Sequence, residues 1–217
     1  RDMGFDRSMI LGYGHDDRVC AYPSMMAVLD YEGTPDYTLC CIITDKEEIG
    51  SVGATGMASH YLENTVAELY ACTADYCELA VRRCLRNSRM LSSDVSAGYD
   101  PNFASAFEKK NSAFLGRGIC FNKFTGSRGK SGSNDASAEV VGKLRKIFAD
   151  NGVVWQMSEL GKVDQGGGGT VAMYLANRNI DTVDAGVPVL SMHAPFECIA
   201  KLDLYMAYKG FGAFYKD

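Results

Sequence analysis

The chain has 217 residues, 47% of them hydrophobic, with a formal net charge of −5 and a sequence pI of about 5.3. This length is enough for one sizeable hydrophobic core and predicts a single domain. The acidic balance excludes general attraction to nucleic acid or anionic membranes, and no apolar run approaches the ~18 residues of a membrane span.

The first half of the chain predicts helices and strands in alternation. Residues 18–30 and 63–87 have apolar positions at helical spacing. Residues 37–44, with the sequence YTLCCIIT, are apolar and rich in β-formers, which predicts a strand buried on both faces. The sequence RMLSSDV predicts a short strand that ends near Asp94.

The second half continues the alternation. It predicts strands over 118–126, 153–160 and 180–193, and helices over 133–152, 170–179 and 196–215. Ser133 or Asn134 is the expected N-cap of the first of these helices. The pattern is typical of an α/β fold with helices flanking a mostly parallel mixed sheet. Such folds place their chemistry where strands end.

Acidic side chains gather at these expected strand ends and turns. Each position alone has a structural interpretation, as a helix cap, a turn residue or a hydrogen-bonded core imidazole. Together they favour a divalent metal site, because carboxylate oxygen and imidazole nitrogen suit Zn²⁺, Mn²⁺ or Co²⁺. The residues are Asp16, Asp17, Glu47, Glu48, Asp94 and His193.

The adjacent Glu47 and Glu48 would repel each other without a cation nearby. In an extended or turning backbone, neighbouring side chains point in different directions. One glutamate can therefore hold a metal while the other faces a water molecule as a general base. This division of roles explains why two carboxylates stand side by side.

Five separated blocks of the sequence resemble the aspartyl aminopeptidase and aminopeptidase I family, in its bacterial branch. The resemblance implies a zinc-exopeptidase fold of the phosphorylase/hydrolase-like type, two divalent metals, most often zinc, and removal of the N-terminal residue from peptides. It also implies self-association into dimer-based large homo-oligomers, with a dodecamer known in the family. The blocks are DRSMILGYGHDDRVCAY, DKEEIGSVGATGM, SSDVSAGYDPNF, ELGKVDQGGGGTVA and VPVLSMHAPFE.

The resemblance also implies a role for each acidic position. Asp16 matches the ligand that bridges the two metals, and Glu47 matches the catalytic general base. Glu48 and His193 match ligands of one metal, and Asp94 matches a ligand of the other.

Asp17 matches a residue that orients the site from behind the ligands. The family has one further histidine ligand upstream and an inserted lid-like domain used for dimerisation. Neither His15 nor His60 matches that ligand. Residues 1–217, which start without methionine or signal peptide, are therefore expected to be the C-terminal part of the catalytic domain of a longer polypeptide, with an incomplete metal pair.

The glycines of DQGGGGTVAMYL lack the Lys-Ser or Lys-Thr of a nucleotide P-loop. Gly168 and Gly169 are candidates for close approach to a substrate, and a tight chain crossing is the alternative. Arg128 and Lys130 are candidates for binding an acidic N-terminal side chain. A solvated strand edge is the alternative for these cations, and Asp100 in the loop after Asp94 argues against acidic selectivity.

The expected function is thus a zinc aminopeptidase that acts on peptides and binds neither nucleic acid nor membrane. A zinc carboxypeptidase or deacylase with the same metal frame is the alternative enzyme, and an inactive structural oligomer is the alternative outside catalysis. The eight cysteines include no CxxC pair and lie in apolar contexts, which predicts reduced core thiols and a cytoplasmic location.

Overall fold

The computed structural model describes residues 1–128, 131–162 and 164–217. Its main sheet has four strands in the order β3-β9-β5-β8, in which β3–β9 and β5–β8 are parallel and β5–β9 is antiparallel. Three smaller sheets accompany it, in the orders β1-β2-β11, β4-β10 and β6-β7. The fold is therefore α/β with mixed sheets, and antiparallel pairing is more extensive than the sequence predicted.

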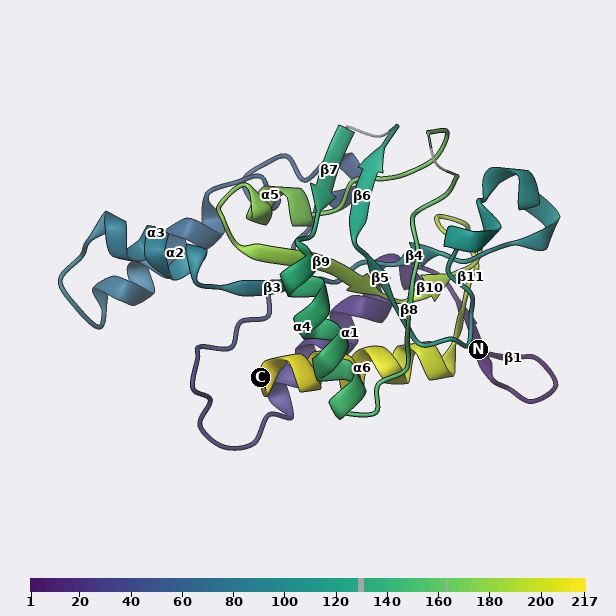
Figure 1. Cartoon of the computed structure of the whole chain (residues 1–217), viewed down its shortest axis with the longest axis horizontal. Helices are drawn as coiled ribbons and strands as arrows, with labels where there is room; N and C mark the ends of the chain where they lie inside the picture. Colours follow the sequence, from purple (N-terminus) through teal and green to yellow (C-terminus); the bar gives the residue numbers. More distant parts are fainter. Residues whose placement is uncertain (129–130, 163) are drawn as a thin grey trace.

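Helices cover one side of the main sheet. Figure 1 shows α1, α4 and α6 together on that side, with α5 and the β6–β7 hairpin at the other. The helices are α1 (His15–Leu29), α2 (Tyr61–Ala71), α3 (Glu78–Arg86), α4 (Ala138–Asp150), α5 (Ala172–Ala176) and α6 (Lys201–Tyr215). Short 3₁₀ helices span Glu47–Ile49, Pro101–Ala106 and Lys109–Asn111.

The strands of the described residues are short, and about half of them fall in segments predicted as strands. They are β1 (Asp2–Met3), β2 (Met9–Gly12), β3 (Arg89–Ser92), β4 (Ser96–Ala97), β5 (Ile119–Asn122), β6 (Phe124–Ser127), β7 (Ser131–Asp135), β8 (Trp155–Met157), β9 (Asp181–Gly186), β10 (Pro188–Val189) and β11 (Glu197–Ala200). Strand β11 occupies the start of the helix predicted over 196–215, so that α6 begins at Lys201.

The core lies between the main sheet and helices α4 and α6. Phe121 of β5 is fully buried and packs against Phe148 of α4 and Trp155 of β8, with ring centroids 4.9 and 5.2 Å apart. Helix α4 begins later than predicted because the Ser137 hydroxyl accepts from the Val140 N–H and so caps it. Ser133 and Asn134, the predicted caps, belong to β7 instead.

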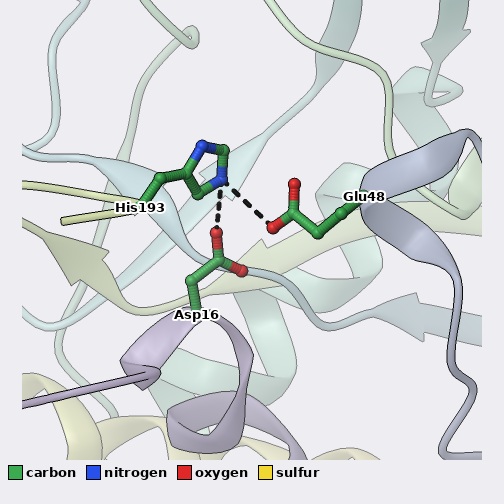
Figure 2. Close-up of side chains that lie close together, drawn as sticks. All are labelled: Asp16, Glu48 and His193. Atoms are coloured by element: carbon green, nitrogen blue, oxygen red, sulfur yellow. Dashed lines mark ion pairs between the residues drawn. The ribbon is translucent and has the colours of Figure 1, made fainter. Parts of the chain in front are cut away.

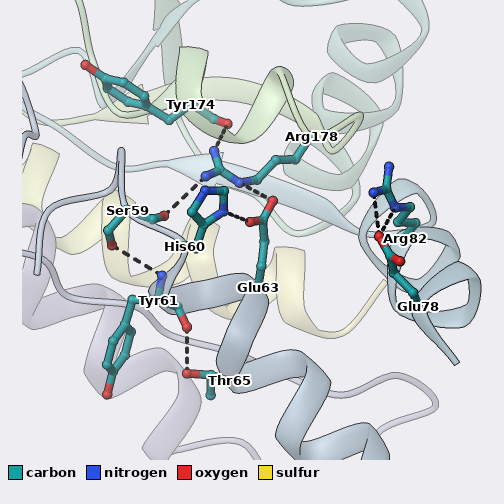
Figure 3. Close-up of polar contacts among 9 residues, drawn as sticks. All are labelled: Ser59, His60, Tyr61, Glu63, Thr65, Glu78, Arg82, Tyr174 and Arg178. Atoms are coloured by element: carbon teal, nitrogen blue, oxygen red, sulfur yellow. Dashed lines mark hydrogen bonds and ion pairs between the residues drawn. The ribbon is translucent and has the colours of Figure 1, made fainter. Parts of the chain in front are cut away.

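The predicted helix over 63–87 is two helices, α2 and α3, joined by a turn. This pair projects from the body in Figure 1. A polar cluster shown in Figure 3 ties its base to α5. The Arg178 guanidinium donates to Glu63 Oε1 at 2.7 Å and to Ser59 O at 3.2 Å, and Glu63 also pairs with His60. His60 is therefore a surface partner of Glu63, in line with its exclusion as a metal ligand.

The predicted buried strand over 37–44 is wrong, because this segment is irregular. Tyr37 and Ile43 are 73% and 59% exposed. A strand requires a hydrogen-bonding neighbour, and no strand of the described residues pairs with this segment. Tyr215 of α6 supports residues 37–44, because its hydroxyl donates to Cys40 O at 3.1 Å.

Three of the eight cysteines, Cys20, Cys120 and Cys198, are buried as predicted, whereas Cys40, Cys72, Cys77 and Cys84 are exposed and Cys41 is half-buried. All eight are free thiols. Within residues 1–128, 131–162 and 164–217, none of the helices is both long and apolar enough to cross a membrane.

A buried acid in the main sheet should make the protein less stable as pH rises. Asp184 of β9 is only 4% exposed, and neither carboxylate oxygen has a hydrogen-bond partner among the described residues. Burial raises its pKa from 3.8 to about 6, although the nearby hydroxyls of Thr170, Ser92 and Thr125 oppose the shift. The folded state therefore binds more protons than the unfolded state between about pH 4 and 6, so stability falls as pH rises through that window.

We expect Asp184→Asn to be more stable than the parent protein at pH 8 and nearly equal to it at pH 4. The gain at pH 8 should be on the order of 3 kcal/mol, from the difference between a pKa of about 6 and 3.8. Urea unfolding at both pH values measures it. Asp181→Asn is the matched control, since Asp181 is exposed on the same strand. Loss of stability at pH 8 in Asp184→Asn would contradict this account.

Candidate metal centre

Three side chains from distant parts of the chain converge at one point. His193 Nε2 lies 2.8 Å from Asp16 Oδ2 and 3.1 Å from Glu48 Oε1. Figure 2 shows both carboxylates directed at the same ring nitrogen. One ligand atom from each residue lies within 4.8 Å of the other two. The structure thus brings together three of the four predicted ligands.

The three residues lie on a helix start, a 3₁₀ turn and the loop between β10 and β11. Asp16 lies in the first turn of α1, next to Asp17. Glu47 and Glu48 form a 3₁₀ turn that Lys46 O closes by accepting from Ser51 N at 2.7 Å. Successive side chains of a 3₁₀ turn point about 120° apart. A turn of this kind directs Glu47 and Glu48 to different places, and of the two Glu48 belongs to the group of three.

Asp94 follows β3 and is outside the group of three. It approaches the main sheet closely, because a Cβ on Gly186 would lie 1.6 Å from the Asp94 carbonyl oxygen. Only glycine fits at that position of β9. Burial, followed by the charges of Asp17 and Glu47, raises the pKa of Asp94 well above its usual range. Asp94 therefore shares the electrostatic environment of the other acids.

The acids destabilise one another's charged forms. Burial and the Glu48 charge raise the pKa of Asp16 to about 6, and the His193 imidazole opposes this shift. Burial raises the pKa of Asp17 to about 8, even though its Oδ1 accepts from Cys20 N at 3.2 Å. Burial and the charges of Glu48 and Asp16 also raise the pKa of Glu47. Such a concentration of perturbed carboxyl groups is typical of functional sites.

The donor set fits a divalent cation. Two carboxylates and an imidazole are ligands that zinc accepts. A cation between them would offset the Glu48 charge, which after burial is the next cause of the raised pKa of Asp16. Asp16 is covered, with 10% of its side chain exposed, whereas the Glu48 and His193 side chains are 58% and 59% exposed. The cluster is therefore buried at Asp16 and open to solvent at Glu48 and His193.

The chain as a whole is similar to one family of known proteins. The model of the aminopeptidase I zinc metalloproteases (M18) matches residues 1–215. The chain belongs to the M18 family.

M18 relatives match along the whole chain. A protein of Clostridium acetobutylicum described as "Probable M18 family aminopeptidase 1" is 55% identical over 214 residues, which cover 99% of this chain and 46% of the relative. The crystal structure of aminopeptidase I from Clostridium acetobutylicum has a TM-score of 0.91 at 52% identity, over 100% of this chain and 46% of that chain. This chain spans about half the length of the curated M18 relatives it matches.

Two further structures agree in fold. An M18 aminopeptidase from Thermotoga maritima has a TM-score of 0.93 at 39% identity, over 100% of this chain and 48% of that chain. The mApe1 dodecamer of S. cerevisiae has a TM-score of 0.79 at 23% identity, over 100% of this chain and 48% of that chain, which is evidence for the fold alone.

The glycines predicted to meet an M18 substrate also have a packing role. Gly168 O accepts from Gly126 N at 3.0 Å, and a Cβ on Gly167 would lie 2.0 Å from Gly126 O. The alternative of a tight chain crossing therefore holds for Gly167. A Cβ on Gly169 would lie 3.2 Å from Gly132 O, so this loop packs along the β6–β7 hairpin.

Three cations near the candidates Arg128 and Lys130 in the sequence have partners of their own. Lys123 pairs with Asp135, Lys109 lies over the Tyr99 ring, and Arg117 lies over the Phe114 ring. Arg128 is exposed on the turn after β6 and has no ion pair within the part of the chain that the structure describes. Lys130 lies outside the described residues.

Sequence reasoning missed two residues that support the M18 site. The Tyr174 hydroxyl of α5 donates to Gly50 O at 2.8 Å and so links the helix after the glycine loop to the 3₁₀ turn of Glu47 and Glu48. Glu197 of β11 is 2% exposed and accepts hydrogen bonds from backbone N–H groups beside the cluster. Glu197 falls within the helix predicted over 196–215, and its backbone partners leave no signal in the sequence.

Proposed function

We propose that this chain forms part of a zinc aminopeptidase that removes the N-terminal residue of peptides. The observation that carries the proposal is the convergence of Asp16, Glu48 and His193 in a member of the M18 family. Asp16 and Glu48 would hold one metal with His193, and Asp94 with Asp16 a second. Two separate positions suit this division, because Asp94 lies outside the group of three yet within electrostatic reach of Asp16.

A bound zinc ion would supply Lewis acidity, which lowers the pKa of water and polarises the scissile carbonyl. Glu47 is assigned the proton transfers. Its carboxylate takes a proton from the attacking water and later delivers it to the leaving amine. The pKa of Glu47 is raised toward neutral pH, and a base with such a pKa can both accept and return a proton. Asp17, behind Asp16, orients that ligand.

The glycine loop is assigned to the substrate. Bare backbone at Gly168 and Gly169 lets this loop pack closely on its neighbours, and Tyr174 of the following helix connects it to the turn of Glu47. Self-association is proposed as well, following the dodecamer of mApe1. Cytoplasmic action accords with free thiols at all eight cysteines.

A panel of substrates tests this function in the complete polypeptide that carries this chain. We expect hydrolysis of amino-acid anilides with a free amine and none of their N-acetylated forms. Hydrolysis of N-acyl amino acids in their place would indicate a deacylase. Failure to cleave any of them, with no zinc bound, would indicate a structural role.

Within the same panel, Arg128→Ala should affect acidic substrates alone. Loss of a charge-assisted hydrogen bond of about 1.5–3 kcal/mol predicts a fall in kcat/KM of about 10- to 100-fold for aspartyl and glutamyl anilides. Alanyl and leucyl anilides should be unaffected. Lys123→Ala is the matched control, because Lys123 is bound to Asp135. Equal effects of Arg128→Ala on all substrates would rule out a role in acidic recognition.

A further inference from the structure

Glu197 is a buried carboxylate that joins two of the metal-site segments through their backbones. It is 2% exposed. Its Oε2 accepts from Asp16 N at 3.1 Å, and its Oε1 accepts from His193 N at 2.8 Å. Both oxygens are thus bound to the residues whose side chains meet 2.8 Å apart at His193 Nε2. Glu197 is not among the residues assigned to the proposed chemistry.

The position of Glu197 is itself fixed. It begins β11, where it pairs with Gly12 of the antiparallel neighbour β2, three residues before the start of α1. Cys198, the next residue, forms a bridge with Leu190, just before the loop that carries His193. Glu197 therefore stands at the junction of the two segments that bring Asp16 and His193 together.

The backbone of His193 needs such support. Its φ of 66° lies in the left-handed region, which few residues other than glycine occupy. A conformation of this kind persists where surrounding contacts impose it. The hydrogen bond to Glu197 is a contact of that kind, and a charged acceptor makes it stronger than a neutral one.

We propose that Glu197 is a positioning residue that sets the spacing between Asp16 and His193 and thereby the metal affinity of the cluster. The inference rests on the proposed function. Glu197 acts through backbone N–H groups and is not assigned as a ligand. Its negative charge beside Asp16 also favours a cation in the cluster.

Zinc affinity of Glu197→Gln in the complete polypeptide tests the proposal. The glutamine amide keeps one acceptor, but its NH₂ group faces the other backbone donor, so one segment is released. We expect zinc affinity, measured by competition with a chromophoric chelator, to fall about 10- to 100-fold, as for outer-shell partners of metal ligands. If Glu197→Gln does not fold, Glu197→Asp, which keeps the charge on a shorter side chain, should show a smaller fall.

Asp203→Asn is a matched control. Asp203 is a buried carboxylate that likewise accepts from two backbone N–H groups, those of Gly116 at 2.7 Å and Gly118 at 2.6 Å. Its substitution should lower the melting temperature about as much as Glu197→Gln and leave zinc affinity unchanged. A merely structural role for Glu197 predicts the same zinc affinity in both variants.

The outcomes separate this inference from the proposed function. Unchanged zinc affinity in Glu197→Gln, with normal binding by the parent protein, would overturn the inference alone. An equal loss of affinity in Asp203→Asn would also overturn it, because the effect would then be one of general stability. Absence of zinc binding by the parent protein would overturn the proposed function and the inference together.

Discussion

Glu47→Gln in the complete polypeptide should retain its zinc and lose about 10²- to 10⁴-fold in kcat, the usual contribution of a general base. Glutamine has nearly the shape of glutamate but cannot take a proton from water. Loss of the Glu47 charge would reduce the repulsion among the neighbouring carboxylates, because Glu48 and Asp16 are among the causes of the raised pKa of Glu47. Metal content by mass spectrometry and steady-state kinetics on one anilide give both quantities.

Glu48→Gln is the matched control for this prediction, one residue along the same 3₁₀ turn. It removes a carboxylate that lies 3.1 Å from His193 Nε2, so zinc and activity should be lost together. The two variants differ in whether the metal stays. The assignment of the base would be wrong if Glu47→Gln kept near-normal turnover, or if it lost the metal as Glu48→Gln does.

Removal of the metal should lower the stability of the complete polypeptide more than any single surface substitution. A metal present at about 1,000 times its Kd stabilises the folded state by about 4 kcal/mol. Without it, Asp16 and Glu48 again repel each other in a partly buried cluster. Melting curves with and without a chelator should differ by several degrees at pH 8.

The difference should shrink on acidification. Without metal, the pKa of Asp16 is raised to about 6, so protons compete for this carboxylate as pH falls below that value. At pH 5 the chelator should have a smaller effect. The double variant Asp16→Asn, Glu48→Gln is the control, and it should melt at the same temperature with or without chelator. A chelator effect that persists in the double variant would place the metal elsewhere.

Elements with their own local signals were predictable from the sequence. Helix α4 has buried residues at Val141, Leu144 and Phe148, on one face, and Gly152 follows its end with a φ of 62°. Strands were less predictable from the sequence, because each depends on a partner strand. The apolar run over 37–44 looks like a core strand, yet nothing in its own residues says which strand would pair with it. The strand predicted over 118–126 contains β5 and most of β6. Strand β7, which completes the hairpin, was missed because it consists of serine, glycine, asparagine and aspartate.

The candidate site divides in the same way. Asp16, Glu48 and His193 were identified because side chains that share a metal have a restricted set of types and positions. Glu197 was missed because it binds backbone N–H groups, which every residue but proline carries and which therefore leave no mark in a sequence. Tyr174 was missed for a related reason, since its partner is the carbonyl of Gly50.

The unequal covering of the cluster bears on which ions it would accept. Asp16 is enclosed, and its backbone is held by Glu197, whereas Glu48 and His193 reach in from the solvent side. Asp16 would therefore be the fixed ligand for ions of different radius, and the two exposed side chains would be the ones free to adjust. Replacement of one metal by another would then leave the packed interior unchanged.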